Sequence, residues 1–146
     1  MAIRIVEAEA PAPSQREAIL APLLAYNTAV AGDPGIAPLA LLLTDEHGDE
    51  RGGLWGRFSY DWLFVELLAV PEDLRGQGLG RELMERAEAL ARARGCKGIW
   101  LDTFEFGARG LYEKLGFTVF GSIEAYVGDQ NRYFLQKRWD AAPIHR

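Results

Sequence analysis

The feature that most constrains the fold is a run of four elements between residues 62 and 104: a strand, a glycine-rich loop, a helix and a second strand. WLFVELLAV (62–70) is apolar at nearly every position, as in a central strand that is buried on both faces. The helix runs from Leu79 to Arg94, and Gly95 ends it before the strand GIWLDTF (98–104). One face of the helix is apolar and consists of Leu79, Leu83, Ala87, Leu90 and Ala91. The four elements predict one right-handed crossover.

The first thirty residues predict a strand and a helix. AIRIVEA (2–8) alternates apolar and polar residues, which is typical of a short strand. SQRE is a capping box, with Ser14 as N-cap and Glu17 three residues later, and predicts a helix that runs to about Val30. Pro22 lies inside this helix, so we expect a kink or a split there.

The remaining segments predict two antiparallel hairpins and a short helix. They are the hairpin of 39–44 with 54–60, the helix 107–117 closed by Gly116, and the hairpin of 117–126 with 132–139. The order is then β-α-β-β-β-α-β-α-β-β. This order predicts an α/β protein in which a mixed sheet carries helices on both faces. The length of 146 residues suits one domain, residues 1–146.

Composition excludes several classes of protein. Hydrophobic content of 49% and charged content of 25% are those of an ordinary soluble domain. No apolar run approaches the roughly 20 residues that span a bilayer, so we expect no membrane partner. The N-terminus lacks the apolar block of a secretory signal, and the single cysteine, Cys96, cannot form an internal disulfide. We therefore expect a cytoplasmic protein.

Net charge is −5 and unevenly distributed. An acidic chain is not expected to be a general nucleic-acid binder. The segment from Arg75 to Lys97, however, contains six basic and three acidic residues. Its net charge is therefore +3, and that of the remainder is −8. A local basic patch suits a small anionic ligand. The alternative is a solvated helix face held by ion pairs between residues four apart.

The glycine-rich loop LRGQGLGRE carries glycines at positions 76, 78 and 80. No Ser, Thr, Asp or Asn between Leu74 and Arg81 could cap the helix that follows, so its first N–H groups are left unpaired. Uncapped donors beside small residues describe a phosphate or pyrophosphate site, with Arg75 or Arg81 adding a charge-assisted contact. The alternative is a tight turn that needs positive φ at one or two glycines.

Two other phosphate-binding loops match this segment poorly. No Lys-Ser or Lys-Thr follows, as a Walker A loop requires. The dinucleotide fingerprint G-x-G-x-x-G fails at Arg81, although Asp102 falls 22 residues after Gly80, near the place of a ribose-binding carboxylate. A dinucleotide loop should also follow the first strand of a parallel sheet rather than the fourth strand of a small domain.

RGQGLG (75–80) resembles the [QR]-x-x-G-x-[GA] acetyl-coenzyme A motif of the GNAT superfamily of N-acetyltransferases. ARGLYEKLGF (108–117) is similar to a second segment of that family, A-x-x-L-Y-x-K-x-G-F, at the usual separation. The resemblance covers about residues 3–139. It implies a central, mostly antiparallel sheet that splays between its fourth and fifth strands, 62–70 and 98–104.

The resemblance also implies how acetyl-coenzyme A would be bound. Backbone amides of the loop would hold the pyrophosphate, and the pantetheine arm would pair with the end of the fourth strand. The residues concerned are Arg75, Gly76, Gln77, Gly78, Leu79, Gly80 and Arg81 in the loop, and Leu68, Ala69 and Val70 in the strand. A backbone N–H there could polarise the thioester carbonyl. This chain has Glu105 where the family often has an asparagine that contacts the cofactor arm, which puts that contact in doubt.

For catalysis, the resemblance makes Tyr112 the general acid, because it matches the family's tyrosine and a phenol can protonate a departing thiolate. Tyr112 could equally be a core residue that packs against Phe117. Glu66 is the best candidate for the base: it is the one ionisable residue in an apolar strand, where burial should raise its pKa. The alternatives are a structural carboxylate, or a water chain to Asp102 or Glu105.

Other chemistry-bearing residues are weak candidates. His47 lies in a hairpin turn and His145 in the C-terminal tail, Cys96 is best explained as a buried structural thiol, and no spacing suggests a metal site. Aromatic groups around one hairpin corner offer an acceptor pocket: Trp55, Phe58, Tyr60 and Trp62. The last hairpin offers a homodimer interface through Tyr133, Phe134 and Trp139.

The sequence therefore predicts an N-acetyltransferase that moves an acetyl group from acetyl-coenzyme A to a primary amine by direct transfer in a ternary complex, without a metal. The charge of −8 outside the loop segment favours a cationic acceptor, either a small molecule or a protein amino group. The alternative is a non-catalytic module that binds acyl-coenzyme A as a sensor.

Overall fold

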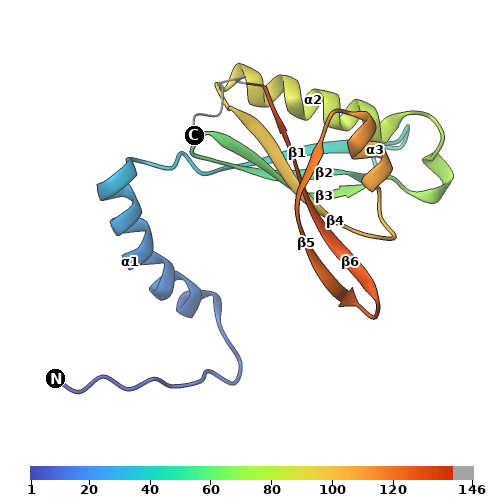
Figure 1. Cartoon of the computed structure of the whole chain (residues 1–146). Helices are drawn as coiled ribbons and strands as arrows, with labels where there is room; N and C mark the ends of the chain where they lie inside the picture. The colour runs from blue at the N-terminus through green and yellow to red at the C-terminus, as the bar shows by residue number, and fades with distance from the viewer. Residues whose placement is uncertain (140–146) are drawn as a thin grey trace, which may run out of the picture. The chain divides into compact units, whose positions relative to one another are not determined.

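The computed structural model describes residues 1–139, and the chain forms two compact units, Met1–Pro34 and a second that begins at Gly35. The helices and strands are coloured along the chain in Figure 1. In chain order they are α1 (Pro13–Ala31), β1 (Ala37–Thr44), β2 (Glu50–Ser59), β3 (Trp62–Ala69), a 3-10 turn (Glu72–Leu74), α2 (Leu79–Ala93), β4 (Gly98–Phe104), α3 (Arg109–Lys114), β5 (Thr118–Val127) and β6 (Gln130–Arg138). His145 lies outside the described residues.

The first unit contains one helix, α1, whose start differs from the prediction. Ala12 is the N-cap, and its N–H donates to Oε1 of Gln15 at 2.8 Å. The predicted cap at Ser14 is therefore wrong by two residues, because Pro13 takes the first helical position, where its fixed φ and missing N–H carry no penalty. Pro22 lies inside one continuous helix, so the predicted split does not occur.

Residues 2–8 do not form the predicted strand. No residue from 1 to 33 is buried, and Ile3 and Ile5 are 83% and 102% exposed. Alternating apolar residues make a strand only when a neighbouring strand accepts their backbone hydrogen bonds. Within the described chain no strand does so, and the sheet has six strands rather than the predicted seven.

The second unit is built on that six-stranded sheet, in the order β1-β2-β3-β4-β6-β5. Four neighbouring pairs are antiparallel, and β3 with β4 is the parallel pair that encloses the crossover through α2. The mixed, mostly antiparallel sheet predicted from the sequence is confirmed. The strands β3, β4 and the helix α2 lie within one or two residues of their predicted bounds.

The sheet opens between β3 and β4. Their pairing runs only from Trp62↔Gly98 to Val65↔Leu101, after which β4 continues beside β6. Beyond Val65, β3 pairs with β2 alone, through Leu67, Leu68 and Ala69. This is the predicted splay.

The core lies on one face of the sheet, which we call the inner face. Buried residues of four strands meet α2 and α3 there: Leu54 and Phe58 of β2, Leu63 and Val65 of β3, Ile99 and Leu101 of β4, Leu135 of β6, Leu83, Met84, Ala87 and Ala91 of α2, and Tyr112 of α3. Because successive side chains of a strand alternate between faces, the residues between these point to the other, outer face. Both helices of the second unit therefore pack on the same face.

Candidate active site

Glycine is needed at the three loop positions for two different structural reasons. Gly76 and Gly78 have φ of 83° and 78°, a conformation that other residues rarely adopt, and a Cβ on either would meet open space. Gly80 is helical, and a Cβ there would lie 3.3 Å from Cδ2 of Leu111. The first two glycines thus shape the turn, and the third lets α2 pack closely against α3.

The start of α2 is uncapped, as predicted. Gly78 is its N-cap residue and no side chain caps the helix. The N–H groups of its first turn are therefore available to an anion, and the helix dipole favours negative charge at this end.

A cleft of about 660 Å³ opens at this helix end. Nine of the residues expected to bind the cofactor line it: Leu68, Ala69, Val70, Arg75, Gly76, Gly78, Leu79, Gly80 and Arg81. Gln77 and Glu105 do not line it. The cleft thus joins the end of β3 to the start of α2.

Five further residues line the cleft: Leu74, Phe106, Gly107, Ala108 and Leu111. None of the five was predicted as a site residue, although Ala108 and Leu111 lie in the segment 108–117 that resembles the second family motif. Gly107 carries a signal of its own, since a Cβ there would collide with Oγ1 of Thr103. Such close backbone packing lets the loop after β4 form the wall opposite the glycine loop.

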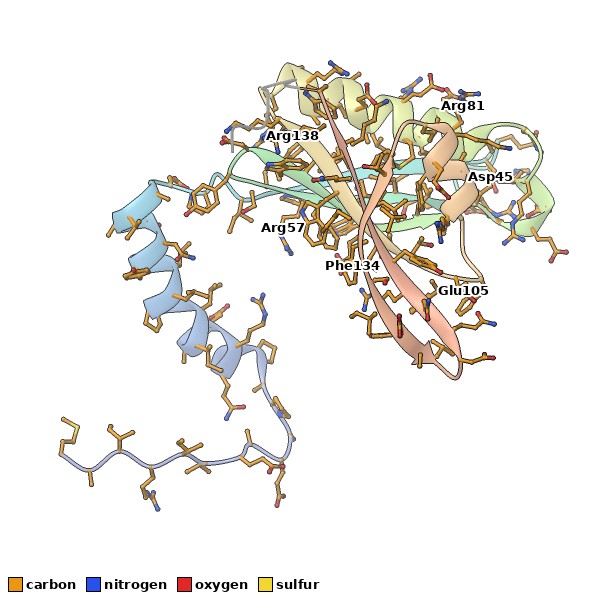
Figure 2. The ribbon with its side chains drawn as sticks, in the orientation of Figure 1. Asp45, Arg57, Arg81, Glu105, Phe134 and Arg138 are labelled. Carbon is orange, nitrogen blue, oxygen red and sulfur yellow. The ribbon has the colours of Figure 1, made fainter. Side chains whose placement is uncertain are left out.

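The two arginines of the loop are placed differently. Arg75 donates through Nε to the carbonyl of Val70 at 3.2 Å, which ties the loop to the end of the strand. Arg81, labelled at the start of α2 in Figure 2, pairs with Glu85 at 3.2 Å across one helical turn. Both side chains are exposed, so their charges stand at the rim of the cleft.

Glu66 does not lie in a buried environment. The pairing of β2 with β3 shifts register between Trp55 and Gly56, which leaves Glu66 as the extra residue of a bulge. Its side chain is exposed, and so is that of Leu67. The expectation that Glu66 is buried is therefore wrong, because the bulge turns it out of the sheet. It does stand at the point where β3 and β4 separate.

Tyr112 is buried in the core and is not among the residues that line the cleft. Its side chain is 6% exposed, and its ring meets that of Phe117 edge-on at 6.0 Å. Burial and, secondarily, the negative charge of Asp102 raise the pKa of Tyr112 to about 12. Tyr112 therefore does pack against Phe117 as a core residue, which was the alternative to a catalytic role. Its phenol keeps its proton throughout the neutral range.

Glu105 and Asp102 are both held by β6. Glu105 accepts hydrogen bonds from the hydroxyl of Tyr133 at 3.1 Å and from the backbone N–H of Asn131 at 3.4 Å. Asp102 forms an ion pair with Arg132 at 2.7 Å. In Figure 2, Glu105 lies towards the last hairpin, away from Arg81. Glu105 therefore fastens the end of β4 to the hairpin.

The basic segment is largely paired along α2. Besides Arg81 with Glu85, Arg92 meets Glu88 at 3.0 Å and Arg86 lies 3.8 Å from Glu82. These pairs match the alternative of a solvated helix face. The positive end of the helix and the loop arginines remain the features that suit an anion.

Cys96 and His47 lie where the sequence predicts them. Cys96 is buried, and burial raises the pKa of its thiol, as for a structural cysteine. His47 is exposed in the hairpin turn. In residues 1–139 no three His, Cys, Asp or Glu side chains gather as metal ligands would, and no helix has the length and apolarity to cross a membrane.

Comparison with known proteins identifies the family of the chain and its fold. The family model of the GNAT acetyltransferases matches residues 16–117. An acetyltransferase of Agrobacterium fabrum, Atu2258, is 40% identical over 123 residues, which cover 84% of this chain and 90% of that protein. The blasticidin-S acetyltransferase of Streptomyces morookaense is 44% identical over 93 residues, 63% of this chain and 68% of that protein.

A crystal structure of a protein described as an acetyltransferase from Agrobacterium tumefaciens has the same fold, with a TM-score of 0.89 and 36% identity. The match covers 94% of this chain and all of that one. The matched family region contains the splayed strands, the glycine loop and all of the residues that line the cleft. The chain belongs to the GNAT family of acetyltransferases, enzymes that take the acetyl group from acetyl-coenzyme A.

Proposed function

We propose that this protein transfers the acetyl group of acetyl-coenzyme A to a primary amine directly, while both substrates are bound. The observation that carries the proposal is the cleft, in which an uncapped helix end meets a strand with free backbone groups. The uncapped helix end suits a pyrophosphate, and the strand with free backbone groups suits an extended amide chain. Acetyl-coenzyme A carries both in one molecule.

The donor would be held mainly by backbone. N–H groups from Gly76 to Arg81 would bind the pyrophosphate, with the charges of Arg75 and Arg81 at the rim. The pantetheine arm would run along Leu68 to Val70, on the side of β3 that β4 has left. A backbone N–H of this segment would then face the thioester oxygen and stabilise the negative charge that develops on it.

The chemistry requires one bond to form and one to break. The lone pair of the neutral amine attacks the carbonyl carbon, and the carbon–sulfur bond breaks as the tetrahedral intermediate collapses. Tyr112 would give its proton to the departing sulfur, and Glu66, directly or through water, would accept the proton that the amine nitrogen loses. The raised pKa of Tyr112 keeps the phenol protonated before the reaction, as an acid requires.

The acceptor is proposed to be a cationic amine. The chain outside the loop segment carries a charge of −8, which attracts a protonated amine to the surface. The similarity to blasticidin-S acetyltransferase supports a small-molecule amine among the acceptors to be tried first. A protein amino group is the second class to try.

Turnover of acetyl-coenzyme A with a panel of amines tests the proposal. The panel holds blasticidin S, a polyamine, an aminoglycoside and a peptide with a free N-terminus, and free thiol release is followed spectrophotometrically. We expect one class to raise thiol release at least tenfold above the amine-free rate, with the acetylated amine found by mass spectrometry. Tight binding of acetyl-coenzyme A without turnover on any amine would favour the sensor module instead.

A further inference from the structure

One wall of the cleft is a short segment between β4 and α3. Phe106, Gly107 and Ala108 line the cleft there, and we call residues 106–108 the wall. A tight turn opens it, in which the N–H of Gly107 donates to the carbonyl of Phe104 at 2.9 Å. Because glycine adopts many backbone conformations, the shape of the wall depends on what holds its two ends.

Tyr133 of β6 contacts both ends of the wall. At the first end, its hydroxyl donates to Oε1 of Glu105 at 3.1 Å. At the second end, the guanidinium of Arg109 lies over its ring, with Cζ 4.2 Å from the ring centroid. Residues 105 and 109 flank the wall directly in the sequence. One side chain thus fixes both where the wall begins and where it ends.

Glu105, labelled beside the last hairpin in Figure 2, is itself tied to β6. Its backbone N–H donates to the carbonyl of Asn131 at 2.9 Å, and its carboxylate accepts the N–H of Asn131 at 3.4 Å. The pairing of β4 with β6 ends at Phe104↔Arg132, so these two bonds extend it by one residue. The carboxylate of Glu105 therefore stands at a fixed place from which it can accept the hydroxyl of Tyr133.

Tyr133 is well placed to act as a support. It lies in β6, an interior strand of the sheet, where it pairs with Thr103 of β4 and Ser122 of β5. Its side chain also packs against the hydrophobic core. A side chain that the sheet and the core already hold loses little further conformational entropy when it holds a loop.

We propose that Tyr133 is a positioning residue for acetyl-coenzyme A: with Glu105 and Arg109, it holds the wall in the shape that the bound cofactor requires. The inference rests on the proposed binding of acetyl-coenzyme A in this cleft. A wall that is ordered before binding spares the complex the entropic cost of ordering it, so the affinity is higher. Glu105 does not line the cleft and acts through Tyr133 rather than by contact with the cofactor.

Calorimetric titration with acetyl-coenzyme A tests the proposal, because Kd is measured without an acceptor amine. Tyr133→Phe keeps the ring and its contact with Arg109 but removes the hydroxyl. We expect Kd to rise about fivefold, a change that the net contribution of one hydrogen bond can supply. The matched control is Tyr126→Phe in β5, which loses a hydrogen bond from Arg132 at 2.9 Å, away from the wall. It should bind within twofold of wild type, and an equal Kd in the two variants would overturn the proposal.

Variants of Glu105 distinguish support through this hydrogen bond from a general loss of structure. Glu105→Ala should raise Kd as Tyr133→Phe does. The double variant should bind no more weakly than Glu105→Ala alone, because both substitutions remove the same hydrogen bond. Glu105→Gln keeps an oxygen that accepts from Tyr133 and should restore Kd to within twofold of wild type. Additive losses in the double variant, or a Glu105→Gln that binds as weakly as Glu105→Ala, would contradict the positioning role.

The results also distinguish this inference from the proposed function. A wild type that binds acetyl-coenzyme A, with the same Kd in every variant, would refute the positioning role and leave acetyl transfer untouched. The expected pattern of Kd values without turnover on any amine would support the positioning role and count against transfer. A wild type that does not bind acetyl-coenzyme A would refute both.

Discussion

The two long helices of this chain differ in composition and in burial. α1 has 19 residues and buries none of them, whereas α2 has 15 and buries Leu83, Met84, Ala87 and Ala91. α2 joins two strands of one sheet, and its apolar face lies on the inner face of that sheet. Apolar residues surround α1, which has two charged residues against six in α2. The apolar face of α2 thus predicts which side of the helix is covered, and α1 has no such face to predict it.

The same substitution in the two helices should have very unequal effects. Ala87→Glu puts a charge where the wild-type side chain is 0% exposed, and we expect a loss of more than about 4 kcal/mol, enough to prevent folding of the second unit. Ala21→Glu, on the exposed side of α1, should change the free energy of unfolding by less than about 0.5 kcal/mol. Chemical denaturation measures both. Equal losses of stability in the two variants would contradict the stated difference between the two helices.

A comparison of one tyrosine in each unit should distinguish a catalytic role of Tyr112 from a packing role. Tyr112→Phe keeps the ring and its contact with Phe117 but removes the proton, and kcat should fall about 10²-fold or more if Tyr112 is the acid. Tyr26→Phe makes the same chemical change on α1 and should leave kcat within twofold. Steady-state kinetics with a saturating amine checks this. An unchanged kcat in Tyr112→Phe would leave the residue a purely structural role.

One glutamate from each unit can be compared in the same way, to test whether Glu66 is the base. Glu66→Gln removes the proposed base at the separation of β3 and β4, and we expect kcat/KM to fall about tenfold, at the low end because water can connect a second carboxylate. Glu17→Gln on α1 is the control and should keep the wild-type kcat/KM. An unchanged kcat/KM in Glu66→Gln would exclude Glu66 as the base.

The smallest expected effect is spectroscopic. The pKa of Tyr112 is raised from 10.0 to about 12, first by burial and then by Asp102. The folded protein therefore keeps this proton between pH 10 and 12 while the unfolded chain loses it, so the contribution of Tyr112 to stability falls as pH rises through that range. The difference in phenolate absorbance between wild type and Tyr112→Phe should show one group titrating near pH 12. A midpoint near 10 would contradict the buried placement.

Local signals in the sequence were enough for most of the second unit. The glycines, the apolar face of α2 and the strand 98–104 predicted the crossover. The resemblance to the family then implied nine of the residues that line the cleft. These signals succeed because glycine conformation and apolar periodicity depend on a few neighbouring residues.

Features that depend on distant pairing could not be found in this way. Glu66 is exposed because β2 shifts its register against β3, and the sequence of β3 alone gives no sign of that bulge. Phe106 and Gly107 reach the cleft through the path of the chain after β4. Residues 2–8 do alternate apolar and polar side chains. A strand also needs a neighbouring strand to pair with, and none of the described strands pairs with these residues.

The most direct test of the central claim, that the glycine loop at the start of α2 binds acetyl-coenzyme A, is calorimetric titration of two matched variants. Gly78 and Gly95 stand at opposite ends of α2, with φ of 78° and 83° and open space around each, so alanine strains both backbones alike. Wild type should bind acetyl-coenzyme A at micromolar Kd and not bind NADH. Gly78→Ala should weaken binding at least tenfold while Gly95→Ala stays within twofold. Equal affinities for the two variants, or binding of NADH instead, would contradict the account.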